Sequence, residues 1–392
     1  MNQGKYCFSQ IMSLVSHKVF SSCVKRYKGD YKIKQFNCWK QFLCMAFGQL
    51  THRESLSDTI ICLTAHANKL YHLGIGDPIS KTTLSRANEK RNWRIYADLC
   101  SLLIQEAKEL YVDDNGLDLE LANNVFAIDA TVIELCLSSF YWAEYKSTAA
   151  GMKLHAQLDL KTAIPEFIHI TRGSVHELNV LDMIRYEADS FYVVDRGYID
   201  FERFYRIHCS SAYFITRARK DFSFERIRSQ APDKINGVLC DQVIQLNQNN
   251  FYVSRSYPEP LRRIKYYDAE NERTFVFLTN NHSLKAIDIA QLYKHRWKIE
   301  LFFKWIKQHL KIKSFWGRTE NAVKTQICIA ITTYVLVAIA KKKFNLKHSL
   351  YEILQVLSIC IFEKGSIPQL FADSIQQQNF KELNDKQRNI FN

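Results

Sequence analysis

Residues 283–311 restrict the fold of this 392-residue chain more than any other stretch, because a helical pattern there places charged side chains inside an apolar face. The polar stripe consists of Tyr293, Arg296, Glu300 and Lys307. At about 100° per residue, these four positions fall within about 60° of one another on one continuous helix. Ile299, Phe303 and Leu310 flank the stripe, so Glu300 is expected among apolar neighbours. A carboxylate in such a place is costly unless it pairs with a cation or binds a metal.

The plainest interpretation of the stripe is a structural ion pair between Glu300 and Arg296, and the helix alone does not decide between that pair and a functional site. Two aspartates favour the functional site. Asp129 interrupts an otherwise apolar predicted strand, and Asp195 directly follows another. Functional groups often gather at strand ends in α/β sheets, although an aspartate there also serves to close a turn or cap a helix.

Two strand carboxylates and one helix carboxylate form a ligand set that suits Mg²⁺, which prefers oxygen ligands and completes its shell with waters and substrate phosphates. Two such ions about 3.5–4 Å apart can activate a water or a 3′-hydroxyl and stabilise the leaving oxygen. Tyr293, Arg296 and Lys307 would then position and neutralise a nearby phosphate. The pattern therefore predicts an active site for chemistry at phosphate.

The middle of the chain predicts a mixed α/β sheet. Its expected strands are 125–133, 152–160, 166–171, 191–194 and 212–216, with helices at 175–187 and 201–208. Residues 218–272 are also expected to be β-rich. One predicted strand pair joins 243–246 to 251–253, and a second joins 262–267 to 273–279, just beyond this segment. Three consecutive strands followed by helix, strand, helix and strand are typical of a mixed sheet flanked by helices.

Both ends of the chain are predicted to be helical. Residues 1–115 contain few β-branched runs and a candidate capping box at Thr51-x-x-Glu54. The first 75 residues hold ten Lys or Arg against three acidic residues, a face that suits DNA phosphates, although a charge run is more often only a solvated surface. Residues 320–392 are expected to form two or three helices with a Gln-rich end.

Overall charge and apolar patterning point to a soluble protein with a polyanionic partner. The formal net charge is +13 and the pI about 9.1. Residues 1–20 lack the apolar core of a signal peptide, and the longest apolar stretch, 327–340, is shorter than the ~20 residues of a membrane helix. The 11 cysteines are scattered, with no C-x-x-C pair, as in a reducing compartment. A cytoplasmic location without a membrane partner is expected.

The Tyr-x2-Arg-x3-Glu-x6-Lys spacing of residues 293–307 is the Y-R-E-K signature, and the sequence resembles the DDE transposases of bacterial insertion sequences that carry it. Five further segments are similar to that group: 127–131, 151–155, 194–198, 295–303 and 310–317. Segments 36–39 and 87–91 look like the domain that precedes the catalytic core in many members. The resemblance covers most of the chain and is weakest after about residue 340.

The resemblance implies a ribonuclease H-like mixed sheet flanked by helices, with a β-rich insertion between the fifth strand and the helix that bears Glu300. The domains implied are a helical DNA-binding domain at 1–118, the catalytic core at 119–217 and 273–318, the insertion at 218–272, and a helical region at 319–392 that is a candidate for dimerisation.

By the matching positions, Asp129, Asp195 and Glu300 are the catalytic, metal-binding triad of two Mg²⁺ ions, for which Mn²⁺ would substitute. Tyr293, Arg296 and Lys307 contact DNA near the cleaved phosphate, and Lys153 and Arg217 are secondary candidates for DNA contacts. Excision in this group is thought to pass through a DNA hairpin, helped by a tryptophan of the insertion. Residues 209–285 contain no Trp, so the candidates for stacking a base are Phe251, Tyr252, Tyr266 and Tyr267.

The implied partners are double-stranded DNA, as the element's terminal inverted repeats and as the target, and a second copy of the chain in a synaptic complex. The implied activity is cleavage at the element's ends and joining of the freed 3′-hydroxyls to target DNA, in the bacterial cytoplasm and on the nucleoid when DNA is bound. Two alternatives remain at this point: a transposase-derived DNA-binding protein that no longer cleaves, and a ribonuclease H-like nuclease without strand transfer.

Overall fold

The computed structural model describes residues 4–219, 223–247, 256–310 and 315–372. The chain divides into two compact units: a helical unit of residues 1–111 and 305–392, and a sheet unit of residues 112–304. Helix α10 (Trp297–His309) begins in the sheet unit, and its residues from Trp305 onward belong to the helical unit.

The helical unit is assembled from both ends of the chain. Its helices are α1 (Cys7–Met12), α2 (His17–Arg26), α3 (Cys38–Leu50), α4 (Leu56–Ala65), α5 (Lys81–Lys90), α6 (Arg94–Tyr111), α11 (Glu320–Lys343) and α12 (Leu350–Cys360). The N–H groups of Cys7 and Phe8 donate to the carbonyls of Glu363 and Ile361, which ties α1 to the segment directly after α12. The C-terminal helices therefore complete the core of the N-terminal ones, an arrangement that the sequence patterns did not predict.

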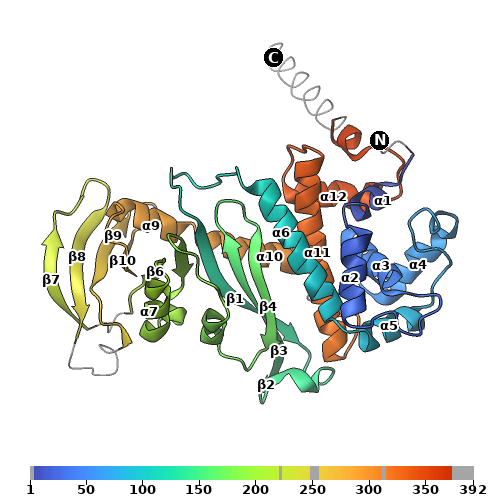
Figure 1. The fold of residues 1–392 in the computed structure, drawn as a ribbon, viewed down its shortest axis with the longest axis horizontal. Coiled ribbons are helices and arrows are strands. Elements are labelled where there is room, and N and C mark those ends of the chain that lie inside the picture. The colour runs from blue at the N-terminus through green and yellow to red at the C-terminus, as the bar shows by residue number, and fades with distance from the viewer. Residues whose placement is uncertain (1–3, 220–222, 248–255, 311–314, 373–392) are drawn as a thin grey trace, which may run out of the picture. The chain divides into compact units, whose positions relative to one another are not determined.

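Helix α11 forms the centre of this unit and packs against α6, α3 and α5 (Figure 1). By length and composition alone it could cross a membrane, but 94% of its most apolar window is buried within the structure. The Tyr111 hydroxyl reaches the Ala338 carbonyl at 2.9 Å, and Thr332 and Thr333 return their hydroxyls to the helix backbone. The prediction of a buried core helix at 327–340 is confirmed.

The candidate capping box at Thr51 and Glu54 is wrong. Thr51 closes α3, where its hydroxyl donates to the Phe47 carbonyl, and Ser55 caps the start of α4. The Ser-x-x-Asp spacing that begins one turn later, at Ser55 and Asp58, carries the cap instead, because the Ser55 hydroxyl accepts from the Asp58 N–H.

The sheet unit contains one ten-stranded mixed sheet in the order β2-β3-β1-β5-β6-β10-β9-β8-β7, with β4 paired to β3 (Figure 1). The strands are β1 (Val125–Leu135), β2 (Glu144–Lys146), β3 (Ala149–Asp159), β4 (Pro165–Arg172), β5 (Phe191–Val194), β6 (Tyr213–Arg217), β7 (Phe224–Gln230), β8 (Val238–Leu246), β9 (Leu261–Asp268) and β10 (Arg273–Thr279). Strands β1, β5 and β6 run parallel, and their neighbours pair antiparallel. The predicted α/β class with flanking helices is confirmed.

The β-type material of residues 218–272 extends this sheet. Strand β10 pairs directly with β6, and β9, β8 and β7 then add one after another at the far edge. Strand β7 was not predicted because its residues alternate poorly and are largely exposed, as on many edge strands. The expected strand 251–253 lies outside the described residues.

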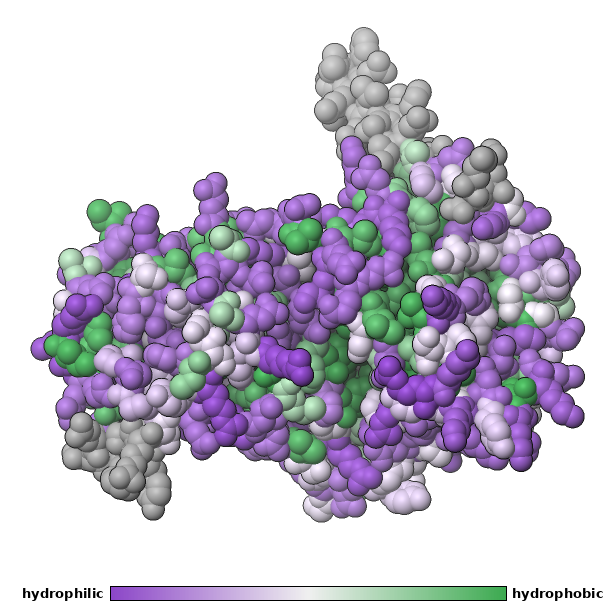
Figure 2. All heavy atoms as spheres, viewed as in Figure 1, coloured by the Kyte–Doolittle hydropathy of each residue, from purple (hydrophilic) through white to green (hydrophobic). Residues whose placement is uncertain are grey.

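Helix α7 (Phe201–Cys209) covers one face of the sheet. Phe204 and Ile207 of α7 pack with Phe126, Ile128 and other apolar residues of β1, β5 and β6 in one buried cluster. Because side chains alternate along a strand, Asp129 and Asp195 point away from this cluster toward the opposite face. Figure 2 shows hydrophilic side chains covering most of the visible surface of the sheet unit, with apolar residues scattered among them.

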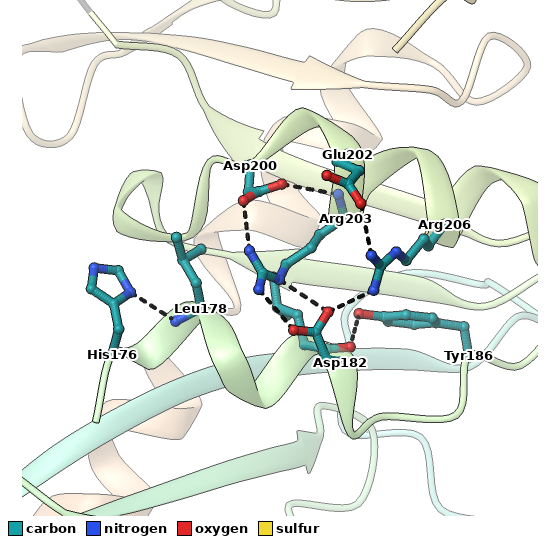
Figure 3. Close-up of polar contacts among 9 residues, drawn as sticks. His176, Leu178, Asp182, Tyr186, Asp200, Glu202, Arg203 and Arg206 are labelled. Carbon is teal, nitrogen blue, oxygen red and sulfur yellow. Dashed lines mark hydrogen bonds and ion pairs between the residues drawn. The ribbon is translucent and has the colours of Figure 1, made fainter. Parts of the chain in front are cut away.

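The helix predicted at 175–187 is wrong, since only the short 3₁₀ helix η3 (Glu177–Asp182) forms there. Asp182 at its end accepts from both Arg203 and Arg206 of α7, and the Tyr186 hydroxyl turns back to the Leu181 carbonyl (Figure 3). Val180, Leu181 and Ile184 pack into the α7 cluster. Tertiary contacts override the helical pattern here.

The helix predicted at 283–311 is also wrong as one continuous element. It is divided into α9 (Ala286–Lys294) and α10 by a turn at residues 295–296. Residues 283–311 contain neither Gly nor Pro, so no local signal marks the break. The turn lies where Tyr293 and Arg296 reach the strand carboxylates, which indicates that these long-range contacts set the new direction.

Candidate active site

The strand register brings Asp129 and Asp195 together. In the parallel pair β1 and β5, Ile128 lies opposite Val194, so the next residue on each strand is an aspartate. Both carboxylates project from the face opposite the α7 cluster and are only partly exposed. The two aspartates are 66 positions apart in sequence, and the apolar residues that precede them determine this proximity by pairing in the sheet.

The turn between α9 and α10 brings the helical signature to the same place. The Tyr293 hydroxyl donates to Asp195 Oδ1 at 3.3 Å. The Arg296 guanidinium bridges two carboxylates, with Nη1 3.3 Å from Asp129 Oδ2 and Nη2 on Glu300 Oε1. The Tyr293 ring is held against Phe277 of β10, with ring centroids 4.9 Å apart. Five residues that the sequence singled out therefore converge in the sheet unit.

Burial controls the electrostatics of this cluster. Burial raises the pKa of Asp129 to about 6, although the Ala130 N–H, which donates to Oδ1 at 2.8 Å, and the Arg296 guanidinium both act to lower it. The neighbouring charges of Asp195 and Glu300 raise that pKa further. Burial also raises the pKa of the Tyr293 phenol to about 12. The cluster thus combines a partly desolvated carboxylate with a tyrosine that remains a hydrogen-bond donor at neutral pH.

The carboxylates suit a hard divalent cation in chemistry, since all three offer oxygen ligands. In the part of the chain that the structure describes, however, no three His, Cys, Asp or Glu side chains are grouped closely enough to hold a metal ion. Arg296 instead links Asp129 to Glu300, whose side chain is 57% exposed. The buried Arg296 Nε has no hydrogen-bond partner among the described residues. The three carboxylates fit a metal ion by their chemistry, and the Arg296 guanidinium now neutralises two of them, Asp129 and Glu300.

A cleft of about 490 Å³ opens beside the cluster. Its basic lining residues are Arg217, Arg273, Lys294 and Arg296, and its aromatic ones include Tyr266, Phe275, Tyr293 and Trp297. The Arg217 guanidinium lies over the Phe275 ring, 4.9 Å from its centroid. Cations placed beside aromatic faces are suited to a nucleic-acid strand, because they meet its phosphates and its bases respectively.

The structure separates the other predicted contact residues. Lys153 lies on β3 with a side chain only 14% exposed, donates to the Val175 carbonyl at 2.9 Å and pairs with Glu177 at 3.4 Å, so it does not join the cluster. Lys307 lies further along α10, in the part that belongs to the helical unit. Tyr266 lines the cleft. Tyr267 is 40% exposed, and Phe251 and Tyr252 lie outside the described residues.

Sequence patterns missed several residues of this site. Trp297, which the apolar pattern predicts to be core, is 48% exposed and lines the cleft. Arg273 and Lys294 line it too, and nothing in their sequence context distinguishes them from other surface cations. Lys298 donates to the Gly116 and Leu160 carbonyls and so anchors the start of α10 beside the sheet.

Comparison with known families agrees with this geometry. Residues 121–336 match the model of the transposase DDE domain. Residues 3–76 match a domain of unknown function (DUF4372). The first match contains all three carboxylates and the α9–α10 turn.

Curated relatives carry the same family name. The transposase y4zB of Sinorhizobium fredii is 30% identical over 291 residues, which cover 72% of this chain and 78% of the relative. A transposase for insertion sequence element IS5377 of Geobacillus stearothermophilus is 26% identical over 65% of this chain and 66% of its own length. One for element IS4SA of Synechocystis is 24% identical over 67% of this chain and 72% of its own.

Among solved structures, the piggyBac transposase synaptic complex with hairpin DNA aligns with 95% of this chain and 82% of its own at a TM-score of 0.47 and 10% identity. The family match over residues 121–336 and the relative from Sinorhizobium fredii establish the family of this chain. The chain belongs to the family of DDE transposases, enzymes of insertion sequences.

Proposed function

We propose that this enzyme binds the terminal inverted repeats of its insertion sequence, cleaves the DNA there by metal-dependent phosphodiester hydrolysis, and joins the freed 3′-hydroxyls to target DNA. The observation that carries the proposal is the convergence of Asp129, Asp195 and Glu300, from two strands and a helix, beside a basic and aromatic cleft. A protein that only binds DNA has no need of partly buried carboxylates there.

Asp129, Asp195 and Glu300 are the residues that would hold the divalent ions, which we propose to be two Mg²⁺ per site with Mn²⁺ as a substitute. When bound, such ions lower the pKa of an attacking water or 3′-hydroxyl and stabilise the charge of the leaving oxygen. Tyr293 holds one Asp195 oxygen through its hydrogen bond and so orients the carboxylate. The Arg296 fork, which now neutralises Asp129 and Glu300, is suited to a phosphate once those carboxylates have another cation.

The cleft supplies the contacts for a DNA strand next to the cleaved bond. Arg217 and Arg273 lie within reach of backbone phosphates, and the Trp297 and Tyr266 rings offer surfaces for bases. The Lys294 ammonium, which pairs with Glu270, adds positive charge to the cleft rim. Lys307, further along α10, is proposed as an additional phosphate contact. Lys153 is not included, because its ammonium is already held by Val175 and Glu177.

Recognition of the element's ends is assigned to the helical unit. Its exposed cations near the end of α2 and in the following loop are Lys25, Arg26, Lys28, Lys32 and Lys34. Such a cluster binds phosphates and steers DNA toward the protein. We further propose that two copies act together on a pair of ends, in the bacterial cytoplasm and on the nucleoid.

A strand-transfer assay tests this function. Two labelled duplexes from the insertion sequence that encodes this chain, one with an uncut end and one with a pre-cut end, are each incubated with a supercoiled plasmid and Mg²⁺, using wild type and Asp129→Asn. Joined products from wild type alone would support the proposal. Cleavage at the end without joining would favour a nuclease, and end binding without cleavage would favour a DNA-binding protein.

A further inference from the structure

Four arginines surround a second pocket in the sheet unit. It has a volume of about 220 Å³ and is lined by Arg196, Arg217, Arg219 and Arg263 together with Ala218, Phe224, Thr274, Phe275 and Val276. Among the residues that the structure describes, no Asp or Glu lines it. Four guanidiniums around so small a space repel one another, so an anion that enters it gains their combined attraction.

The four arginines come from three separate segments of the chain. Arg196 directly follows the strand-end Asp195, Arg217 ends β6, Arg219 follows two residues later, and Arg263 lies on β9. Their gathering is therefore a property of the folded sheet, made when β10 and β9 add to the edge of β6. Only Arg217 and Arg219 belong to one segment, so a local run of charges does not explain the whole set.

Aromatic rings hold two of these guanidiniums in place. Arg263 lies over Phe224 with its guanidinium carbon 5.0 Å from the ring centroid, and Arg217 lies over Phe275 at 4.9 Å. A cation over a ring face keeps its N–H groups available, because the contact uses the ring's electrons and no hydrogen-bond acceptor. The Arg263 Nη1 group donates a hydrogen bond to Gln242 Oε1 at 3.1 Å and a weaker one to the Cys240 sulfur at 3.7 Å. The forks are thus preorganised for an oxyanion.

The pocket adjoins the cleft beside the carboxylates. Arg217 and Phe275 line both spaces, and Arg196 is the next residue after Asp195. A strand whose scissile phosphate lies at the carboxylates can therefore continue past Arg217 into the pocket without leaving a positively charged surface.

We propose that this four-arginine pocket binds a backbone phosphate of the DNA strand, close to the phosphate that is cleaved. The inference rests on the proposed function for the identity of the strand and adds a phosphate site that the signature residues do not include. The pocket's volume of about 220 Å³ suits a single phosphate with its sugar.

The test replaces single phosphates of the DNA by neutral methylphosphonates, one position at a time around the cut, and measures binding in EDTA so that no cleavage occurs. The probe is a duplex with the element's own end, together with an unrelated duplex of equal length. The pocket variant is Arg196→Gln with Arg219→Gln, since both side chains are exposed. The matched control is Arg185→Gln with Lys234→Gln, which removes the same charge from exposed sites outside the pocket.

We expect wild type and control to bind about tenfold more weakly when one particular phosphate near the cut is neutralised. The pocket variant should bind the unmodified end more weakly and no longer respond at that position. Its slope of log binding constant against log salt should fall by about 0.9 for the one lost phosphate contact, while the control keeps the wild-type slope.

The proposal is overturned if the pocket variant responds to every methylphosphonate as wild type does, or if only its oligomeric state changes, which would assign the pocket to an acidic protein segment. Binding of both duplexes with no cleavage in Mg²⁺ would remove the proposed catalysis and still let the methylphosphonate series decide on the pocket. Absence of any DNA binding by wild type would overturn both.

Discussion

The Tyr293 hydroxyl donates a hydrogen bond to Asp195 Oδ1 at 3.3 Å and so joins the helical signature to a strand-end carboxylate 98 residues earlier. The bond forms because Phe277 of β10 supports the Tyr293 ring and because α9 ends one residue later. The bond fixes the Asp195 side chain from α9, while β5, which ends at Val194, fixes the Asp195 backbone. We regard this contact as a positioning device for the carboxylate.

Tyr293→Phe should therefore retain the ring packing and lose the hydrogen bond. We expect a loss of about 0.5–1.5 kcal/mol in unfolding free energy and a cleavage rate lowered by about tenfold to 100-fold. The matched control is Tyr186→Phe, which removes a 2.8 Å bond to the Leu181 carbonyl away from the site. Urea unfolding and a cleavage time course measure both effects. Equal cleavage by both variants would show that Tyr293 is only structural.

Arg296 neutralises the carboxylates that a metal ion would need. Arg296→Gln should then bind Ca²⁺ about tenfold more tightly than wild type in the absence of DNA, because a competing cation is gone. It should also cleave DNA more slowly, since the fork that meets the phosphate is lost. Calorimetric titration with Ca²⁺ compares it with Lys294→Gln, which removes a charge from the same cleft. Unchanged or weaker Ca²⁺ binding by Arg296→Gln would contradict the assignment.

A buried ion pair supports the start of α9. Arg262 of β9 and Asp241 of β8 have side chains only 3% and 6% exposed and form a two-pronged contact, and Arg262 also donates to the Leu284 carbonyl at 2.6 Å. Arg262→Met should cost about 3–5 kcal/mol of unfolding free energy, because Asp241 is left charged and buried. Adding Asp241→Leu should recover much of that loss. Urea unfolding compares the single and double variants. A double variant no more stable than Arg262→Met would contradict the claim that an unpaired buried Asp241 causes the loss.

His155 makes the stability of the sheet unit depend on pH. Its ring is buried on β3, with Nε2 2.9 Å from the Thr171 hydroxyl, and burial lowers its pKa from 6.5 to about 4. Between pH 4 and pH 6.5 the unfolded chain binds a proton at His155 more readily than the folded chain does. The contribution of His155 to the unfolding free energy is therefore fully present above about pH 6.5 and is lost as the pH falls toward 4. His155 alone should contribute about 2 kcal/mol to the fall between pH 8 and pH 5, while Asp129, whose pKa is raised to about 6, acts in the opposite direction. His155→Gln should flatten this part of the urea-unfolding profile. An undiminished slope would contradict the prediction.

Much of the catalytic face could be predicted because the signals are local. Apolar runs before Asp129 and Asp195 predict strands, and strands of the same direction bring their ends to the same edge. The spacing of Tyr293, Arg296 and Glu300 placed three polar groups on one side of a helical segment. The structure brings these three to the strand carboxylates, although through a turn and not along one helix.

The remaining features depend on contacts between distant residues, which no local pattern encodes. The break at residues 295–296 has no Gly or Pro, and the helical periodicity of 175–187 gives way to packing against α7. Strand β7 carries charges on both faces, so its sequence shows no strand alternation. The four-arginine pocket exists only because β9 and β10 extend the sheet beyond β6.

The most direct test of the account measures metal-dependent cleavage by Glu300→Gln. A duplex labelled at the end of the encoding insertion sequence is incubated with Mg²⁺, with Mn²⁺ and with EDTA, beside wild type and the exposed-site control Glu225→Gln. We expect nicking at the element's end by wild type and control only when metal is present. Glu300→Gln should bind the duplex as tightly as wild type and leave it uncut. Cleavage by Glu300→Gln at the wild-type rate, or cleavage by wild type in EDTA, would contradict the central claim that three carboxylates form a metal-dependent active site.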